Sequence, residues 1–182
     1  SYDILQLLYY DLRDYDRSIQ YGEAAVNYFR KNEDSIWLGN ALSNLGMSYS
    51  KRKKYKEAES SWKEALAIGK NIGHVEMQAA QLLNIADLHY SKGEYDQLKN
   101  YYEKALELSN ILNSSETKAV SYRGLGVYYF FRKDFEQAKA MALNALQIAN
   151  EEQMLPEKAK ILELLSRIHF GLQEVVAGQQ YA

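Results

Sequence analysis

Residues 42–49 read LSNLGMSY, and this pattern of apolar and small residues returns three times at a constant spacing of 40 residues. It stands at residues 82–89 (LLNIADLH), 122–129 (YRGLGVYY) and 162–169 (LELLSRIH). A fixed period of this length indicates a protein built from stacked copies of one structural unit. The period therefore decides the class of fold before any single residue does.

Further columns of similar residues keep the same register along the chain. One column is aromatic, one is alanine, one is mainly aliphatic and one is small: Tyr15, Tyr55, Tyr95 and Phe135; Ala25, Ala65, Ala105 and Ala145; Tyr28, Ile68, Leu108 and Ile148; Gly46, Ala86, Gly126 and Ser166. Aromatic and small residues that recur at helical spacing usually pack in a core. We therefore assign these columns to packing, and note that Gln6 breaks the small column in the first unit.

The composition is typical of a globular protein and excludes several functional classes. Hydrophobic residues make up 47% of the 182 residues, but no apolar run approaches the ~20 residues that cross a bilayer. A formal net charge of -2 gives no general attraction to nucleic acid or to an anionic membrane. Cysteine is absent and no targeting segment is visible, so the compartment stays open between cytoplasm and periplasm.

Each 40-residue unit is predicted to form two antiparallel helices, because apolar residues recur at spacings of three and four. We expect helices at about residues 35–52, 55–72, 75–92 and 94–112, with Gly73 and Gly93 in the turns between them. Asp34 or Ser35 is expected to cap the first of these helices.

Local signals continue this pattern toward the C-terminus. Asn113 is expected to end its helix in a left-handed conformation, and Ser114 or Ser115 to cap the next one. Asp134 opens the partner helix, and Pro156 stands where a first helical turn tolerates proline.

The resulting prediction is one all-α domain over residues 1–182, a right-handed α-solenoid of about four and a half to five helix pairs. The repeats are expected at about residues 1–33, 34–73, 74–113, 114–153 and 154–182, the last of them truncated. Both ends look cut, because Ser1 falls inside a helical pattern and Val175 and Val176 lack a following pair to cover them before Ala182. We expect a domain taken from a longer protein.

The repeat resembles the tetratricopeptide repeat in its pattern of large and small residues: Leu42, Leu45, Gly46, Tyr49, Tyr55, Ala58, Trp62 and Ala65. The resemblance covers essentially the whole chain. It departs from the family in its period of 40 instead of 34 and in lacking the terminal proline, and is similar to the 40-residue variants of peptide-pheromone receptors, cell-polarity adaptors and bacterial sensor proteins. Leu98 stands where a small residue is expected, which predicts less regular packing in the third repeat.

Residues that the core does not use are candidates for binding in the concave groove. At ~100° per residue, the face of each first helix opposite to the core carries these candidates: Asn44, Met47, Asn84, Asp87, Tyr90, Arg123, Val127, Phe130 and Arg167. A carboxamide both donates and accepts hydrogen bonds, so Asn44 and Asn84 could hold a ligand's peptide groups. The resemblance implies the same, since several peptide-binding members use this asparagine position; exposure to water is the alternative.

A second group in the groove is chemically different. Arg123 could pair with a carboxylate, while Phe130, Phe131 and Phe170 could form an apolar floor for a ligand. The alternative is that Phe131 and its neighbours pack against the adjacent helix pair.

Other constellations favour structural interpretations. The basic run at residues 51–56 lies in one turn and does not recur, so nucleic-acid binding through this domain is not expected. His89 and His169 replace a core tyrosine two repeats apart, which does not suit a metal site. No motif for catalysis is present, and we expect neither enzymatic activity, nor a cofactor, nor membrane insertion.

The leading hypothesis is a protein- or peptide-binding scaffold that serves as the sensory or regulatory module of a larger signalling protein. The alternative is a structural module that self-associates through the apolar ends of its solenoid, without a peptide ligand.

Overall fold

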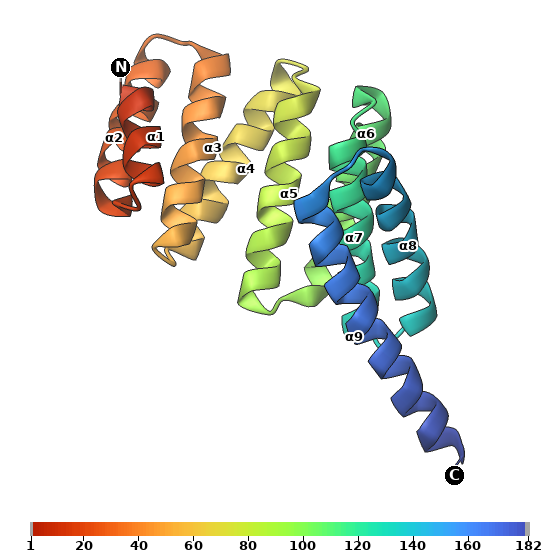
Figure 1. The fold of residues 1–182 in the computed structure, drawn as a ribbon. Coiled ribbons are helices and arrows are strands. Elements are labelled where there is room, and N and C mark those ends of the chain that lie inside the picture. The colour runs from red at the N-terminus through yellow and green to blue at the C-terminus, as the bar shows by residue number, and fades with distance from the viewer. Residues whose placement is uncertain (1, 181–182) are drawn as a thin grey trace. The chain divides into compact units, whose positions relative to one another are not determined.

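A computed structural model of the protein describes the backbone of residues 2–180 and the side chains of residues 2–173 (Figure 1). Within that range there are nine α-helices, one short 3-10 helix and no strand. In chain order they are α1 (Tyr2–Asp11), α2 (Tyr15–Lys31), α3 (Ser35–Lys51), α4 (Tyr55–Asn71), α5 (Val75–Lys92), η1 (Tyr95–Gln97), α6 (Leu98–Leu112), α7 (Ser115–Phe131), α8 (Phe135–Glu151) and α9 (Leu155–Gln180). The predicted all-α architecture of antiparallel helix pairs is confirmed.

The helices begin at the capping residues that the sequence indicates. The Asp34 carboxylate accepts a hydrogen bond from the Trp37 backbone N–H at 3.2 Å, and Asp134 does the same for Gln137 at 3.2 Å. Of the two candidate serines, Ser114 is the cap, because its hydroxyl accepts from the Thr117 N–H at 3.2 Å. Each bond satisfies a backbone donor that has no partner within the helix.

All eight turns between the α-helices are built alike, with one residue of positive φ and the same closing hydrogen bond. The positive-φ residues stand every 20 positions: Arg13, Glu33, Lys53, Gly73, Gly93, Asn113, Lys133 and Gln153. After each of them, the next N–H donates to the carbonyl five residues back, for example His74 to Gly69 at 2.8 Å. This is the bond that ends helices with a left-handed residue. The sequence indicated this conformation at Gly73, Gly93 and Asn113 only.

The third repeat begins irregularly. A helix was expected from about residue 94, but η1 covers Tyr95–Gln97 and α6 begins at Leu98. Leu98 is fully buried where Ala58 and Ala138, also fully buried, stand in the neighbouring repeats. A 3-10 turn is tighter than an α-helical turn, and it is the form the chain takes just before this larger side chain.

The chain divides into two compact units, residues 1–88 and 89–182, with the boundary inside α5. In the first unit, α1 packs on α2, α2 on α3 and α3 on α4, and the first helices of the first two pairs, α1 and α3, also touch. In the second unit, α6, α7, α8 and α9 pack in the same sequential way, and α7 touches α9. The division lies within a predicted repeat, and one continuous domain stays a prediction.

Each unit has its own hydrophobic core, to which the alanine column contributes. Ala25 and Ala65 are fully buried in the first unit, as are Ala105 and Ala145 in the second. Around Ala25 and Ala65 pack larger aliphatic residues: Ile19, Val26, Leu42 and Leu45. The side chains of Val175 and Val176, like all of Ser1 and Ala182, lie outside the described residues.

Large and small residues are matched across the helices of each pair. In the second pair, a Cβ added to Gly46 would collide with the Trp62 indole, whose Nε1 donates to the Ser43 carbonyl at 3.0 Å. In the first pair the sizes are reversed, because Gln6 stands at the position of Gly46 and Gly22 at that of Trp62. The break in the small column is therefore compensated by its neighbour.

Candidate functional site

Asn44 lines a hollow on the face of the first helices in the first unit. The hollow has a volume of about 250 Å³ and lies between α1 and α3, where Asp3, Leu7, Trp37 and Asn40 also reach it. The Asn44 side chain is half-buried, and among the described residues no group hydrogen-bonds its carboxamide. The carboxamide donor and acceptor therefore both remain available beside the hollow.

Asn84 holds the equivalent place one repeat later, on α5. Its Nδ2 donates to Oε1 of Gln81 at 3.3 Å, one turn earlier on the same helix, and Gln81 is 2% exposed. The amide nitrogen is thus oriented by a buried side chain. Both asparagines lie in the first unit, on the first helices of neighbouring pairs, whose backbones approach where Met77 packs over Gly39.

Two further predicted site residues also lie in the first unit. Met47 on α3 is half-buried, and Asp87 on α5 is exposed and makes a polar interaction with its surroundings. Asp87 is therefore held in place in the unliganded protein.

The aromatic residues predicted for the groove form a connected cluster in the second unit. Phe131 stacks on Tyr95 with ring centroids 3.5 Å apart, and Tyr90 contacts both rings, at 5.9 Å from Tyr95 and 6.3 Å from Phe131. Phe130 lies 5.5 Å from Phe131 and 5.8 Å from Phe135 on α8. Phe131 therefore has a packing role within the cluster. Tyr90, in contrast, remains 41% exposed.

Val127 belongs to the core more than to a surface. It is half-buried and packs, like Phe130, against the buried cluster of the second unit that includes Ala138, Ala142 and Leu164. Phe170 behaves differently, because 67% of it is exposed.

Arg123 is paired within the protein. Its Nε forms a short ion pair with the Glu157 carboxylate on α9, and Lys160 contacts the other oxygen of that carboxylate at 3.3 Å. The side chains of Arg123 and Glu157 are only 16% and 11% exposed. We predicted that Arg123 would bind a ligand's carboxylate, but its guanidinium is already bound by Glu157. In the structure, this ion pair joins α7 to α9.

Arg167 has the opposite character. It is exposed on α9. Its guanidinium carbon lies 4.7 Å from the ring centroid of Phe130 and 5.9 Å from that of Phe131. Among the described residues, no carboxylate forms an ion pair with it. Contact with an aromatic face leaves the edge N–H groups of a guanidinium available.

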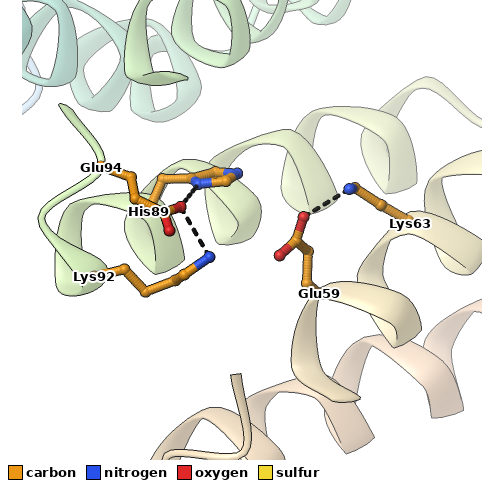
Figure 2. Close-up of polar contacts among 5 residues, drawn as sticks. All are labelled: Glu59, Lys63, His89, Lys92 and Glu94. Carbon is orange, nitrogen blue, oxygen red and sulfur yellow. Dashed lines mark hydrogen bonds and ion pairs between the residues drawn. The ribbon is translucent and has the colours of Figure 1, made fainter. Parts of the chain in front are cut away.

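His89 closes the turn between α5 and η1, as Figure 2 shows. Its Nδ1 lies 2.6 Å from Oε2 of Glu94, which also accepts from the Lys92 ammonium at 2.8 Å. The hydrogen bond from Lys92, followed by that from His89, lowers the pKa of the Glu94 carboxyl. The imidazole also stacks on Tyr101 with centroids 5.3 Å apart. The buried histidine has a packing role, as its place in the tyrosine column predicts.

Polar links also join helices on the face of the second helices in the first unit. Tyr49 on α3 donates a 2.6 Å hydrogen bond to Glu23 on α2, and Arg30 on α2 pairs with Glu64 on α4 at 2.7 Å. Burial, reinforced by the bond to Glu23, raises the pKa of the Tyr49 hydroxyl. Figure 2 also draws a pair within α4, Glu59 and Lys63, at 2.6 Å. The first two of these contacts link α2 to α3 and to α4 in the first unit.

Glu157 is the functional neighbour that sequence reasoning missed. The 40-residue register places it in a column with Trp37, Met77 and Thr117. Met77 is 4% exposed and packs on Gly39, whereas Trp37 is half exposed. Because Trp37 in the same column is half exposed, the column does not mark Glu157 as buried, and the sequence carried no clear signal of its pairing with Arg123.

A second hollow in the first unit is mainly apolar. It measures about 600 Å³ and is lined by Tyr2, Leu5, Tyr28, Phe29 and Trp37. Because its exposed lining is mainly apolar, it offers few hydrogen-bonding groups to a peptide backbone. It is therefore a weaker candidate for a ligand site than the hollow at Asn44.

Two searches of the described part of the chain were negative. No group of histidine and acidic side chains there has the arrangement of a metal site. None of the helices there combines the length and the apolar character that crossing a membrane requires.

Comparison with known proteins gives one family match and several structural relatives. The model of the tetratricopeptide repeat matches residues 7–71 and 78–151. The apo form of RapI is similar over 99% of this chain and 50% of its own, with 19% identity and a TM-score of 0.84. A signal-transduction ATPase with a tetratricopeptide repeat sensor, from Pyrococcus horikoshii, is similar over 98% of this chain and 30% of its own (18%, 0.82).

A third relative is a set of nearly identical repeats from a kinesin light chain of Podospora anserina. It is similar over 98% of this chain and 88% of its own, with 14% identity and a TM-score of 0.78. A search of functionally characterised proteins gave no significant match. The chain thus spans half of RapI and less than a third of the ATPase, and identities of this size establish the fold alone.

Proposed function

Because the chain belongs to the tetratricopeptide repeat family, we propose that it binds a peptide segment of a partner protein on the face of its first helices. The observation that carries this proposal is the pair Asn44 and Asn84. They stand at the same place on neighbouring first helices of one unit, and the Asn44 carboxamide lies beside a hollow with no partner among the described residues.

The chemistry of the pair suits a peptide backbone. Each carboxamide offers two donors and an acceptor, and so matches the N–H and C=O of an extended segment in the way that another strand would. Asn84 keeps its amide oriented through Gln81, which lowers the entropy that a ligand would have to remove. Tyr90, Phe130 and Phe170 belong to the second unit, where they form an apolar surface of their own.

We further propose that the module is the sensory or regulatory part of a larger signalling protein. Two of its structural relatives support this proposal. The ATPase from Pyrococcus horikoshii is described as carrying its repeats as a sensor, and both it and RapI are longer than this chain. The module itself is proposed to act by binding, without catalysis.

A displayed library of random 12-residue peptides tests the proposal. The immobilised protein should enrich peptides whose binding falls at least tenfold in the double variant Asn44→Ala with Asn84→Ala, because two hydrogen-bonding side chains are lost. Asn27→Ala with Asn100→Ala is the matched control, since both asparagines are exposed on second helices. Failure to enrich any peptide, or equal retention by both double variants, would remove the asparagine pair from the account.

Self-association is the second candidate, and exposed apolar residues on α1 and in the turn after it favour it. Ile4 and Leu12 are each 65% exposed, and Leu8 is 49% exposed. Exposed apolar patches of this kind drive association between copies. Light scattering over a hundredfold range of concentration should then show a rising mass that Ile4→Asp with Leu8→Asp abolishes; a constant monomer mass would contradict it.

A further inference from the structure

The second unit presents one arginine in a form that is ready to bind an anion. The Arg167 guanidinium is held over Phe130 with its carbon 4.7 Å from the ring centroid. This contact restricts the rotation of a long side chain, so a ligand would not have to order it. The edge of the guanidinium keeps the paired N–H groups that bind both oxygens of a carboxylate.

Two of the acidic side chains around this site are engaged elsewhere, whereas the exposed Glu163 is not. Glu157 is bound by Arg123 and Lys160, and Asp96 pairs with Arg132 at 3.2 Å. Glu163 lies one turn before Arg167 on α9, yet the guanidinium stacks on Phe130 and forms no ion pair with it. The Arg167 guanidinium therefore forms no ion pair with any described carboxylate.

Exposed aromatic surface adjoins the charge. Phe170 is 67% exposed and lies three residues after Arg167, so both side chains occupy the same side of α9. Phe130 is half-buried beneath the guanidinium, and its neighbour Phe131 contacts Tyr90. A segment that carries an acidic residue beside an apolar one would match this charge and this surface together.

We propose that Arg167 anchors an aspartate or glutamate side chain of the partner segment, with a neighbouring apolar side chain packed against Phe130 and Phe170. The inference rests on the proposed function, because it assumes that a protein segment occupies this face. It adds the charge of the partner segment, because the preferred segments are expected to be acidic. The carboxylate recognition expected at Arg123 is thereby assigned to Arg167.

Two short peptides of the same shape and different charge test the proposal. The probes are acetyl-glutamyl-phenylalanine amide and acetyl-glutaminyl-phenylalanine amide, titrated into the whole chain while the Arg167 Nε–Hε signal is followed by NMR. A charge-assisted pair of hydrogen bonds predicts at least about tenfold tighter binding of the glutamyl peptide. Arg167→Gln should abolish that preference. Arg132→Gln, which removes an exposed arginine already paired with Asp96, should leave it unchanged.

Three results would overturn the assignment. The first is that the two peptides bind equally well, or that neither binds. The second is that the preference for the glutamyl peptide is unchanged in Arg167→Gln. The third is that acetyl-glutaminyl-phenylalanine with a free terminal carboxylate binds as tightly as the glutamyl peptide, which would show that the site binds chain ends. Failure here would leave the proposed function standing if library peptides still bind through Asn44 and Asn84. Loss of that asparagine dependence is a separate outcome, read from the library experiment alone.

Discussion

Gln6 and Gly22 form a size-matched pair between α1 and α2, because a Cβ on Gly22 would lie 2.5 Å from Nε2 of Gln6. Gln6 is fully buried, and neither polar atom of its carboxamide has a hydrogen-bond partner among the residues that the structure describes. One repeat later the large residue is on the second helix and the small one on the first, as Trp62 and Gly46. Each contact therefore pairs one large side chain with one glycine, but the large side chain comes from the first helix in one pair and from the second helix in the next.

The first prediction is that Gly22→Ala changes sign with its background. In the natural protein, overpacking against Gln6 should outweigh the helix-propensity gain of alanine and destabilise by about 1 kcal/mol. In Gln6→Ala the same change should stabilise by about 0.5–1 kcal/mol, since the carboxamide is gone and the Leu45 Cδ1 methyl, 3.0 Å from the added Cβ, has room to shift into its place. Urea unfolding of the four proteins measures the coupling. Additive effects would show that the two side chains do not meet.

The second prediction is that Gln6→Met stabilises the protein. Methionine is close to glutamine in volume and leaves no buried donor or acceptor without a partner, which should contribute about 1–2 kcal/mol. The hydrogen bond from the Ser18 hydroxyl is kept, because it ends on the Gln6 backbone carbonyl at 2.9 Å. A lower unfolding midpoint in urea would indicate that the Gln6 carboxamide has partners in solution.

The third prediction concerns the left-handed turn residues. Lys133 has φ 60°, and replacing it by glycine should stabilise by about 0.5–1 kcal/mol, because glycine adopts this conformation without a Cβ penalty. Gly73→Ala should destabilise by a similar amount. An added Cβ at Gly73 meets nothing within 4 Å, so its effect isolates the backbone term. Thermal unfolding measures both effects. A shift of the two unfolding temperatures in the same direction would contradict this explanation.

The period explains why so much of the fold could be predicted and why these turns could not. Helix bounds followed from apolar spacing and from caps such as Asp34 and Ser114, which act within a few residues. Lysine or glutamate in a left-handed turn carries no such local signal. At those turns the conformation is imposed by the packing of the two helices and by the closing hydrogen bond five residues back.

The binding face was predictable only in part, for a related reason. The helical period places Asn44, Asn84 and Arg167 on the expected side of their helices. It does not reveal that Arg123 meets Glu157, 34 residues away, or that Arg167 stacks on Phe130. Such contacts depend on how neighbouring repeats approach one another, and a single sequence records that only indirectly.

The fourth prediction separates the structural arginine from the binding face. Glu157→Leu should destabilise by about 2–3 kcal/mol, because it leaves the guanidinium of Arg123 in a mostly buried place without its carboxylate. The double variant Arg123→Leu with Glu157→Leu should cost less than the single one, since no uncompensated charge remains. Guanidinium chloride denaturation compares them. A double variant as unstable as the sum of the singles would argue against the pair.

The last prediction is a pH dependence at the turn after α5. The bonds from Lys92 and His89 lower the pKa of Glu94 from its usual value of 4.5, so Glu94 stabilises the folded state above about pH 4.5. That contribution is lost as the pH falls from there through the lowered pKa. It should be under about 1 kcal/mol, because the Glu94 side chain is 43% exposed. Urea midpoints should therefore favour the natural protein over Glu94→Gln at pH 7 and approach each other at a pH well below 4.5. The exposed Glu107→Gln on α6 serves as the matched control, and a Glu94→Gln deficit that is the same at both pH values would refute the charge-based account.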